Sequence, residues 1–239
     1  MTGWLRARTA VDRALAVALA VVAGPVVGVL AIVIRCYDGK PSLVRLTRVG
    51  QAGKHFDMWK LRTMRVDGAA GQAGGAPIAS RDDERVTPVG RRLRRWRLDE
   101  LPQLFNVVSG EMALLGPRPE TPEYVDLADD RWQRVLQARP GIAGPTQLAI
   151  HEVEAEAIRT EDGEDLYLDV ILPAKLRIDY WYVEQASPFI DLLVVVSLVQ
   201  RFLLRRDVLI LDAVIRRHVV DVASVRRAVE ARAAPGTLW

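Results

Sequence analysis

Two adjacent carboxylates, Asp99 and Glu100, follow directly on a run of arginines in this 239-residue chain. The arginines lie within seven positions, at Arg91, Arg92, Arg94, Arg95 and Arg97. Carboxylates supply nucleophiles and ligands for divalent cations, whereas guanidinium groups bind phosphate oxygens in a fixed fork geometry. Acids and bases at this density indicate a site that handles both a divalent cation and a phosphorylated substrate.

Two further segments repeat this chemistry. In Pro117-Arg118-Pro119, a proline on each side restricts the backbone around one guanidinium, which suits a positioned phosphate ligand. The segment that contains Lys60 and Arg62 adds two cations and the hydroxyl of Thr63. Both segments are candidates to join the carboxylates in one site.

Each of these features also has a purely structural interpretation. An Asp before a helix with a Glu in the first turn is typical of a capped helix N-terminus, and such an N-terminus also attracts phosphate. The arginine run could equally be a solvated helix face or a membrane-surface contact. Because Arg91, Arg94 and Arg95 share one helical face with Leu98, only some of the arginines can reach a site.

Other kinds of site are excluded by composition and motif content. The single cysteine, Cys36, rules out an intrachain disulfide and a cysteine zinc site, and His55, His151 and His218 show no metal-binding spacing. No Walker loop, dinucleotide glycine motif or Gly-x-Ser-x-Gly elbow is present. The formal charge of +3 reflects local basic clusters, which fit nucleotides, nucleic acid or anionic lipid headgroups.

The N-terminal part contains an uncharged apolar run from Ala14 to Ile34. As a helix it would reach roughly 30 Å, the hydrocarbon thickness of a bilayer, and it is longer than the roughly 7–15 apolar residues of a signal peptide. Gly24 and Pro25 lie in its middle, and basic residues flank both ends. Since basic flanks favour the cytoplasmic side, this pattern is consistent with a helix-break-helix that enters one leaflet and returns. A single-pass anchor with a tolerated proline kink is the alternative.

Apolar periodicity and turn residues predict the remaining elements. We expect short strands over 43–46 and 55–59, a loop over 67–79, and helices over 85–97, 101–108 and 123–137. A partly helical segment over 153–172, an interfacial helix over 189–204 and an amphipathic helix over 207–231 complete the chain.

Taken in order, the motifs are similar to those of a known family. They are Lys60-Leu61-Arg62-Thr63-Met64, Arg85–Arg94, Leu98–Val107, Gly116-Pro117-Arg118-Pro119, Arg139–Gly144 with Gln147, and Lys175–Tyr182. The chain resembles the bacterial sugar transferase family, the monotopic polyprenyl-phosphate phosphoglycosyl transferases, over about residues 8–204. It departs from the family pattern at Glu111-Met112-Ala113 and Pro145-Thr146, and Gly24-Pro25 replaces a frequent Ser-Pro pair.

The resemblance implies an α/β but predominantly helical fold in three parts. Residues 1–40 would form the re-entrant membrane hairpin, with its break at Gly24 and Pro25. Residues 41–206 would form a compact catalytic domain held by interfacial amphipathic helices on inner-leaflet lipids. Residues 207–239 would be an amphipathic extension that the resemblance leaves without a role. The implied location is the cytoplasmic face of the bacterial plasma membrane, in monotopic form, and a homodimer is compatible with it.

The resemblance also implies a reaction. A sugar 1-phosphate would pass from a nucleotide-sugar, usually a UDP-sugar, to polyprenyl (undecaprenyl) phosphate, giving polyprenyl-diphosphate-sugar and UMP at the start of surface glycoconjugate assembly. Asp99 would form a covalent phosphosugar intermediate, and Glu100 would hold Mg²⁺. The phosphate contacts would come from Lys60, Arg62, Arg94, Arg118 and Arg139.

Two other functions use the same basic residues without a nucleophile. One is a non-catalytic membrane-anchored adaptor whose basic surface binds lipid or a partner. The other is a nucleic-acid binder, which is disfavoured because Trp96 alone interleaves the arginine run. We therefore expect no nucleic-acid partner.

Overall fold

The computed structural model describes residues 3–65, 85–160, 162–202, 211, 213–215 and 219–233. The helices are α1 (Gly3–Ala7), α2 (Thr9–Tyr37), α3 (Pro88–Arg95), α4 (Gln103–Ser109), α5 (Asp130–Val135), α6 (Pro145–Ala157), α7 (Gly163–Leu166), α8 (Leu172–Gln185), α9 (Pro188–Phe202) and α11 (Val222–Ala233). The strands are β1 (Leu43–Val49), β2 (His55–Leu61), β3 (Ala113–Leu115) and β4 (Gly141–Ala143). The expected predominance of helix is confirmed, and the predicted loop over 67–79 lies outside the described residues.

The predicted pair of N-terminal strands is confirmed as an antiparallel hairpin. β1 pairs with β2 in a register that runs from Leu43 opposite Leu61 to Val49 opposite His55. The backbone closes between them because the Gly50 N–H donates to the Lys54 carbonyl at 2.8 Å. β2 therefore ends directly before the segment that contains Arg62 and Thr63.

Helix α3 begins at a side-chain cap and packs closely against the segment after β2. The Thr87 hydroxyl accepts a hydrogen bond from the Gly90 N–H at 2.8 Å, and Pro88 occupies the first helical position. A Cβ at Gly90 would lie 2.1 Å from the Thr63 carbonyl oxygen, so only glycine allows this approach. The basic helix is thereby fixed against the end of β2.

Strands β3 and β4 pair in parallel, and β3 ends just before Pro117-Arg118-Pro119. The Gly141 N–H donates to the Pro117 carbonyl at 2.8 Å. A Cβ at Gly141 would lie 2.1 Å from the Gly116 nitrogen, so the two backbones meet where no side chain fits. This contact fixes the chain immediately before Arg118.

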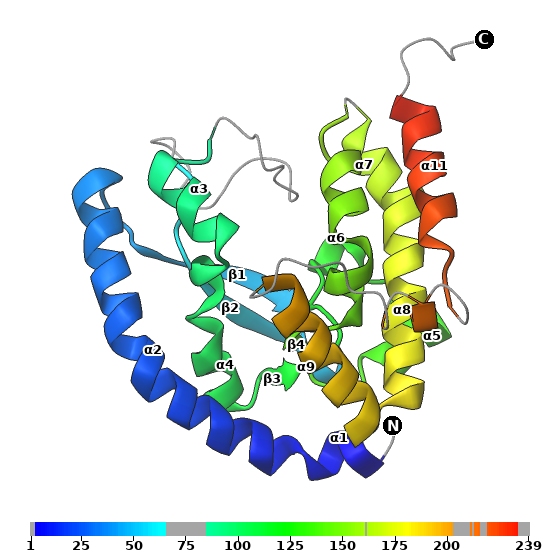
Figure 1. Ribbon diagram of the computed structural model, residues 1–239, viewed down its shortest axis with the longest axis horizontal. Coiled ribbons are helices and arrows are strands. Elements are labelled where there is room, and N and C mark those ends of the chain that lie inside the picture. Colours follow the sequence, from blue (N-terminus) through cyan, green and yellow to red (C-terminus); the bar gives the residue numbers. More distant parts are fainter. Residues whose placement is uncertain are drawn as a thin grey trace.

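The apolar N-terminal segment is one long curved helix, α2, which forms the outer edge of the molecule (Figure 1). It is the one helix among the described residues that is long and apolar enough to cross a membrane. The predicted break at Gly24 and Pro25 is wrong, because helical structure continues from Thr9 to Tyr37 with Pro25 inside it. Proline removes a single backbone donor and bends a helix, and the turns on both sides are supported by packing.

Helix α2 packs lengthwise on the rest of the molecule. In the N-terminal half of α2, Ala16 is fully buried against Met58 of β2 and Leu104 of α4. Towards its other end, Ile34 is fully buried with Leu93 of α3. The opposite face is apolar and exposed, at Val11, Leu15, Val17, Leu19, Val21, Val22, Val26, Val29 and Ile32.

The C-terminal half packs around α6 and α8 (Figure 1). The amphipathic helix predicted over 207–231 is confirmed in part as α11, which begins only at Val222, and several residues between 207 and 221 lie outside the described residues. Val225 and Val229 of α11 join Ile150 of α6 in one apolar core. The interfacial helix predicted over 189–204 corresponds to α9.

The helix predicted over 123–137 is wrong in its first half, where the chain makes a 3₁₀ turn over Pro122–Tyr124 before α5. Hydrogen bonds accepted by two aspartates explain why α5 begins only at Asp130. The Asp126 Oδ1 atom accepts from the Ala128 N–H, and Asp129 caps α5 by accepting from the Arg131 N–H, each at 2.8 Å.

Candidate active site

The two carboxylates lie on a single 3₁₀ turn, Leu98–Glu100, between α3 and α4. The residue before it, Arg97, has a left-handed backbone with φ of 51°, which is costly for a non-glycine residue and turns the chain sharply after α3. The interpretation of Asp99 as a helix cap is wrong, because α4 is capped by Pro102 without a side-chain hydrogen bond. Both carboxylates are nevertheless buried, with 6% of Asp99 and 8% of Glu100 exposed.

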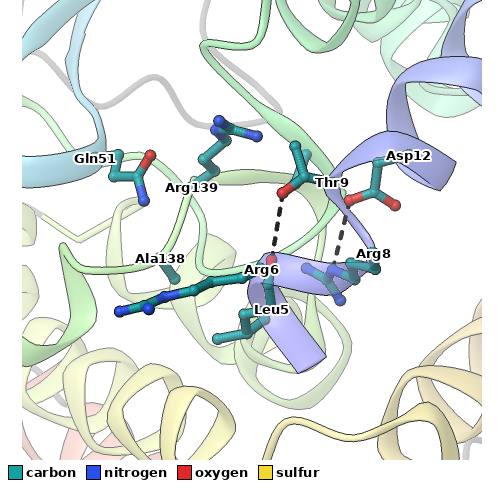
Figure 2. A pocket seen from close by; sticks show the side chains of 9 residues that line it. Leu5, Arg6, Arg8, Thr9, Asp12, Gln51, Ala138 and Arg139 are labelled. Carbon is teal, nitrogen blue, oxygen red and sulfur yellow. Dashed lines mark hydrogen bonds and ion pairs between the residues drawn. The ribbon is translucent and has the colours of Figure 1, made fainter. Parts of the chain in front are cut away.

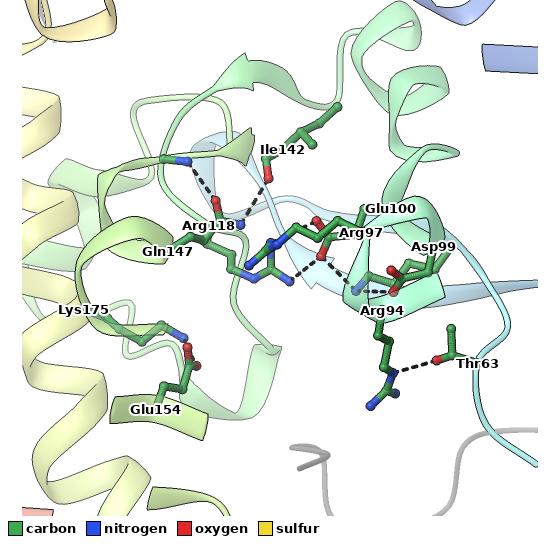
Figure 3. Close-up of polar contacts among 12 residues, drawn as sticks. Thr63, Arg94, Arg97, Asp99, Glu100, Arg118, Ile142, Gln147, Glu154 and Lys175 are labelled. Atoms are coloured by element: carbon green, nitrogen blue, oxygen red, sulfur yellow. Dashed lines mark hydrogen bonds and ion pairs between the residues drawn. The ribbon is translucent and has the colours of Figure 1, made fainter. Parts of the chain in front are cut away.

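Three cations from three different segments surround the Glu100 carboxylate (Figure 3). Its Oε1 atom accepts from Arg118 Nη2 at 3.0 Å and from Lys60 Nζ at 3.3 Å. Its Oε2 atom accepts from Arg97 Nη1 at 3.2 Å. Although burial opposes ionisation, the charges of Arg118, Lys60 and Arg97 hold the pKa of Glu100 well below its usual range. Glu100 in turn raises the pKa of the Arg118 guanidinium.

Asp99 shares one of these cations. Its Oδ2 atom lies 3.8 Å from Lys60 Nζ, so a single ammonium group on β2 faces both carboxylates. The predicted association of Lys60 and Arg118 with the two carboxylates therefore agrees with the structure. The result is a compact group of two buried acids and three partly exposed bases.

The position of Lys60 depends on a buried amide on α4. The Asn106 Oδ1 atom accepts from the Trp59 N–H at 3.1 Å, and the Asn106 Nδ2 group donates to the Asp57 carbonyl at 2.8 Å. These bonds fix the residues of β2 that precede Lys60. Sequence reasoning overlooked Asn106, and it did not separate Arg97 from the other arginines. A buried polar residue within an otherwise apolar helix was the available signal for Asn106.

Arg94 lies beside the turn but faces another way. In Figure 3 its side chain extends from α3 away from the carboxylates, and its Nε group donates to the Thr63 hydroxyl at 2.9 Å. Arg94 thus lies at the margin of the site.

The structure does not bring Arg62 or Arg139 to the carboxylates. The Arg62 guanidinium donates to the carbonyls of Lys40 at 2.7 Å and Gly39 at 2.8 Å, and also to that of Asp38. It therefore secures the C-terminal end of α2. Arg139 lies just before β4 and lines a cavity near α1 instead.

A second buried polar group lies behind Arg118. The Glu120 Oε2 atom accepts from Lys175 Nζ at 2.8 Å and from the Tyr167 hydroxyl at 2.7 Å. Glu154, which lies beside Lys175 in Figure 3, accepts from the same ammonium group at 3.1 Å. Lys175 holds the pKa of the Glu120 carboxyl below its usual range. Since Glu120 is two residues beyond Arg118, this network fixes the backbone that presents the guanidinium.

Asp179 makes protein stability depend on pH in a defined direction. Burial raises the pKa of this carboxyl, which is hydrogen-bonded to Thr146, to about 7. The folded state therefore keeps a proton that the unfolded state loses, and this group's contribution to stability falls between about pH 4 and pH 7. We expect Asp179→Asn to gain stability relative to the wild type across this range, by at most about 1.4 kcal/mol per pH unit. Chemical denaturation in detergent at several pH values measures the difference, and a constant difference between the two proteins would contradict it.

The donor set suits Mg²⁺ only together with a substrate. Among the described residues there is no group of three or more His, Cys, Asp or Glu side chains that could hold a metal ion. Asp99 and Glu100 supply two adjacent carboxylates, and Mg²⁺ commonly binds through one or two carboxylates plus substrate phosphates. The three cations on Glu100 oppose binding of free Mg²⁺ there, whereas a diphosphate would offset their charge.

The chain matches a known protein family over most of its length. The model of the bacterial sugar transferase family matches residues 4–205, which include the whole site. The chain belongs to the bacterial sugar transferase family. The prediction made from the ordered motifs is thus confirmed.

Several bacterial transferases are similar to this chain. It is 32% identical over 81% of its length to the UDP-N-acetylgalactosamine-undecaprenyl-phosphate N-acetylgalactosaminephosphotransferase of Aeromonas hydrophila. It is 42% identical over 52% of its length to the UDP-glucose:undecaprenyl-phosphate glucose-1-phosphate transferase of Caulobacter vibrioides. It is 32% identical over 71% of its length to the undecaprenyl-phosphate galactose phosphotransferase of Salmonella typhimurium.

The chain spans less than half the length of these three relatives, namely 44%, 46% and 35%. All three are named as sugar phosphate transferases, so they give no support to the adaptor alternative.

Proposed function

We propose that this protein transfers a sugar 1-phosphate from a nucleotide-sugar, most simply a UDP-sugar, to undecaprenyl phosphate or a similar polyprenyl phosphate. The observation that carries the proposal is the buried Asp99–Glu100 pair, which lies within reach of Lys60, Arg97 and Arg118. Cations at this density bind and neutralise a diphosphate, and a carboxylate beside them can attack it. The named activities of the relatives support the same substrates.

The reaction proceeds in two displacements at one phosphorus atom. A carboxylate oxygen of Asp99 attacks the sugar-linked phosphorus, and the bond from that phosphorus to the oxygen shared with the nucleoside phosphate breaks. Nucleoside monophosphate leaves, and the sugar phosphate remains as an acyl phosphate on Asp99. An oxygen of the lipid phosphate then attacks the same phosphorus, which frees the Asp99 carboxylate and forms polyprenyl-diphosphate-sugar. One difficult transfer is thereby divided into two easier ones.

The cations have separate roles in these steps. Lys60 faces both carboxylates, so its ammonium group can stabilise negative charge first on Asp99 and then on the transferred phosphoryl group. Arg118, fixed through its backbone and Glu120, would hold a phosphate oxygen of the donor, and Arg94 would contact the substrate from the margin. Glu100, with Asp99 beside it, would hold Mg²⁺, which when bound neutralises the diphosphate and stabilises the leaving group.

We also propose that the protein lies on one face of the membrane, with α2 and α9 in the interface. The exposed face of α2 is apolar, and on α9 the exposed side chains include Phe189 at 66% and Leu192 at 57%. Helix α2 is packed against β2, α3 and α4 along its length, so a transverse orientation would draw these polar elements into hydrocarbon. A monotopic position on the cytoplasmic face keeps Asp99 close to both a soluble nucleotide-sugar and a lipid phosphate.

The identity of the released nucleotide tests the proposed reaction. We expect the membrane-reconstituted protein, given undecaprenyl phosphate, Mg²⁺ and a panel of UDP-sugars, to release UMP with at least one of them. Chromatography of the nucleotide products distinguishes UMP from UDP. Release of UDP would contradict the proposal, because it indicates transfer of the sugar without its phosphate.

A further inference from the structure

A cationic cavity lies at the junction of α1 and α2 (Figure 2), and neither Asp99 nor Glu100 lines it. Its volume is about 300 Å³. Arg6 of α1, Arg139 just before β4 and Gln51, whose amide donates to the Gln137 carbonyl at 2.8 Å, are among the residues that line it. The cavity thus brings together cations from segments more than 130 positions apart in the chain.

The charge of these two arginines is only partly balanced within the cavity, because Asp12 interacts electrostatically with Arg139 as well as with Arg8. The cavity's one carboxylate, Asp12, lies 3.4 Å from Arg8, and Arg8 is also paired with Asp191. Within the described part of the chain, no hydrogen bond or ion pair joins Arg6 or Arg139 to another side chain. Arg8 therefore has a structural role, whereas Arg6 and Arg139 are available to an anion.

Part of the cavity lining is apolar. It is formed by Leu5, Ala113 and Ala138, all of which are buried. Leu5 belongs to the apolar cluster that joins α1 to α8 and α9, and α2 begins its exposed apolar face at Val11, immediately beyond the cavity. A ligand here would meet arginine and apolar side chains together, close to the proposed membrane face.

We propose that this cavity binds the phosphate of an anionic membrane-lipid headgroup, with Arg6 and Arg139 as the phosphate ligands. Guanidinium groups hold phosphate oxygens through paired charge-assisted hydrogen bonds, and the apolar part of the lining accommodates the carbon atoms next to the phosphate. The choice of a lipid phosphate rather than free phosphate rests on the membrane placement proposed above. Binding at this cavity does not depend on the proposed transfer reaction. In this arrangement Arg139 binds a phosphate other than that of the nucleotide-sugar.

The test is calorimetric titration of the full-length protein, in an uncharged detergent, with short-chain phosphatidylglycerol. We expect saturable binding to the wild type and at least tenfold weaker binding to the Arg6→Gln/Arg139→Gln double variant. The matched control is Arg131→Gln/Arg177→Gln, which removes the same charge from exposed arginines outside the cavity. Arg6→Gln alone, on an exposed residue of α1, should weaken binding at least threefold without disturbing β4.

Three outcomes would overturn the proposal. Equal weakening in both double variants would show attraction by net charge alone, and unchanged binding in the Arg6 and Arg139 variants would exclude the cavity. Equally tight binding of inorganic phosphate, lost in the same variants, would replace the lipid by free phosphate. Asp99→Asn should bind the lipid as the wild type does, so a failure of the transfer reaction remains separate from a failure of this site.

Discussion

Replacing Asp99 with Asn should abolish sugar phosphate transfer, with a fall in turnover of at least about 10⁴-fold, as is typical when a nucleophile is removed. Asn preserves the shape of the side chain but offers a poor nucleophile. Because Asp99 is buried on a short 3₁₀ turn, the substitution changes the chemistry of the site with little change in its geometry. Release of UMP from a UDP-sugar in the presence of lipid acceptor measures the effect.

Asp57→Asn is the matched control for this variant. Asp57 lies on β2, the strand that carries Lys60, but 49% of its side chain is exposed and it pairs with Arg45 at the surface. Its loss should leave turnover within about twofold of the wild type, since such surface pairs contribute only about 0–1 kcal/mol. Substantial turnover in Asp99→Asn would assign the nucleophile to another group.

Replacing Glu100 with Gln should lower turnover by about 10²- to 10³-fold, the range seen when one preorganised electrostatic contact is lost. The amide cannot neutralise the three cations that converge on Glu100, and it is a weaker ligand for Mg²⁺. The Mg²⁺ concentration that gives half-maximal rate should therefore rise. Steady-state rates measured as a function of Mg²⁺ concentration test both effects.

Stability provides a second measure of the same variant. Removing one partner of a buried ion pair leaves the other charges uncompensated and costs about 3–5 kcal/mol. Partial exposure of Lys60, Arg97 and Arg118 reduces that cost, so a clear fall in melting temperature is expected but not loss of the fold. The control is Glu152→Gln, whose side chain is 64% exposed and pairs with Arg201. If Glu100→Gln and Glu152→Gln showed the same Mg²⁺ dependence, Glu100 would not be the metal ligand.

The sequence predicted the contents of the site better than its geometry. Lys60, Asp99, Glu100 and Arg118 could be grouped because residue type and local context suggested phosphate chemistry. Arg62 shows the limit of that reasoning, since its charge satisfies three carbonyls at the end of α2. Which anion or carbonyl a guanidinium meets depends on long-range packing, and residue type does not encode it.

The fold shows the same division between local and long-range information. The β1–β2 hairpin and α3 follow from local patterns, namely alternation, a glycine turn and a Thr-Pro cap. The parallel pairing of β3 and β4 was not predicted, because each strand is three residues long and their contact depends on two distant glycines. At Pro25, the local tendency to break the helix is overcome by packing of the turns on both sides.

Mass spectrometry of the intact protein tests the proposed covalent step most directly. The wild type is incubated with Mg²⁺ and its UDP-sugar substrate in the absence of polyprenyl phosphate, and the mass is then measured before and after the lipid is added. We expect an added mass equal to one sugar phosphate less one water, located on the peptide that contains Asp99 and removed when the lipid is added. Release of UMP without any adduct, or the same adduct on Asp99→Asn, would contradict the assignment of Asp99 as the nucleophile.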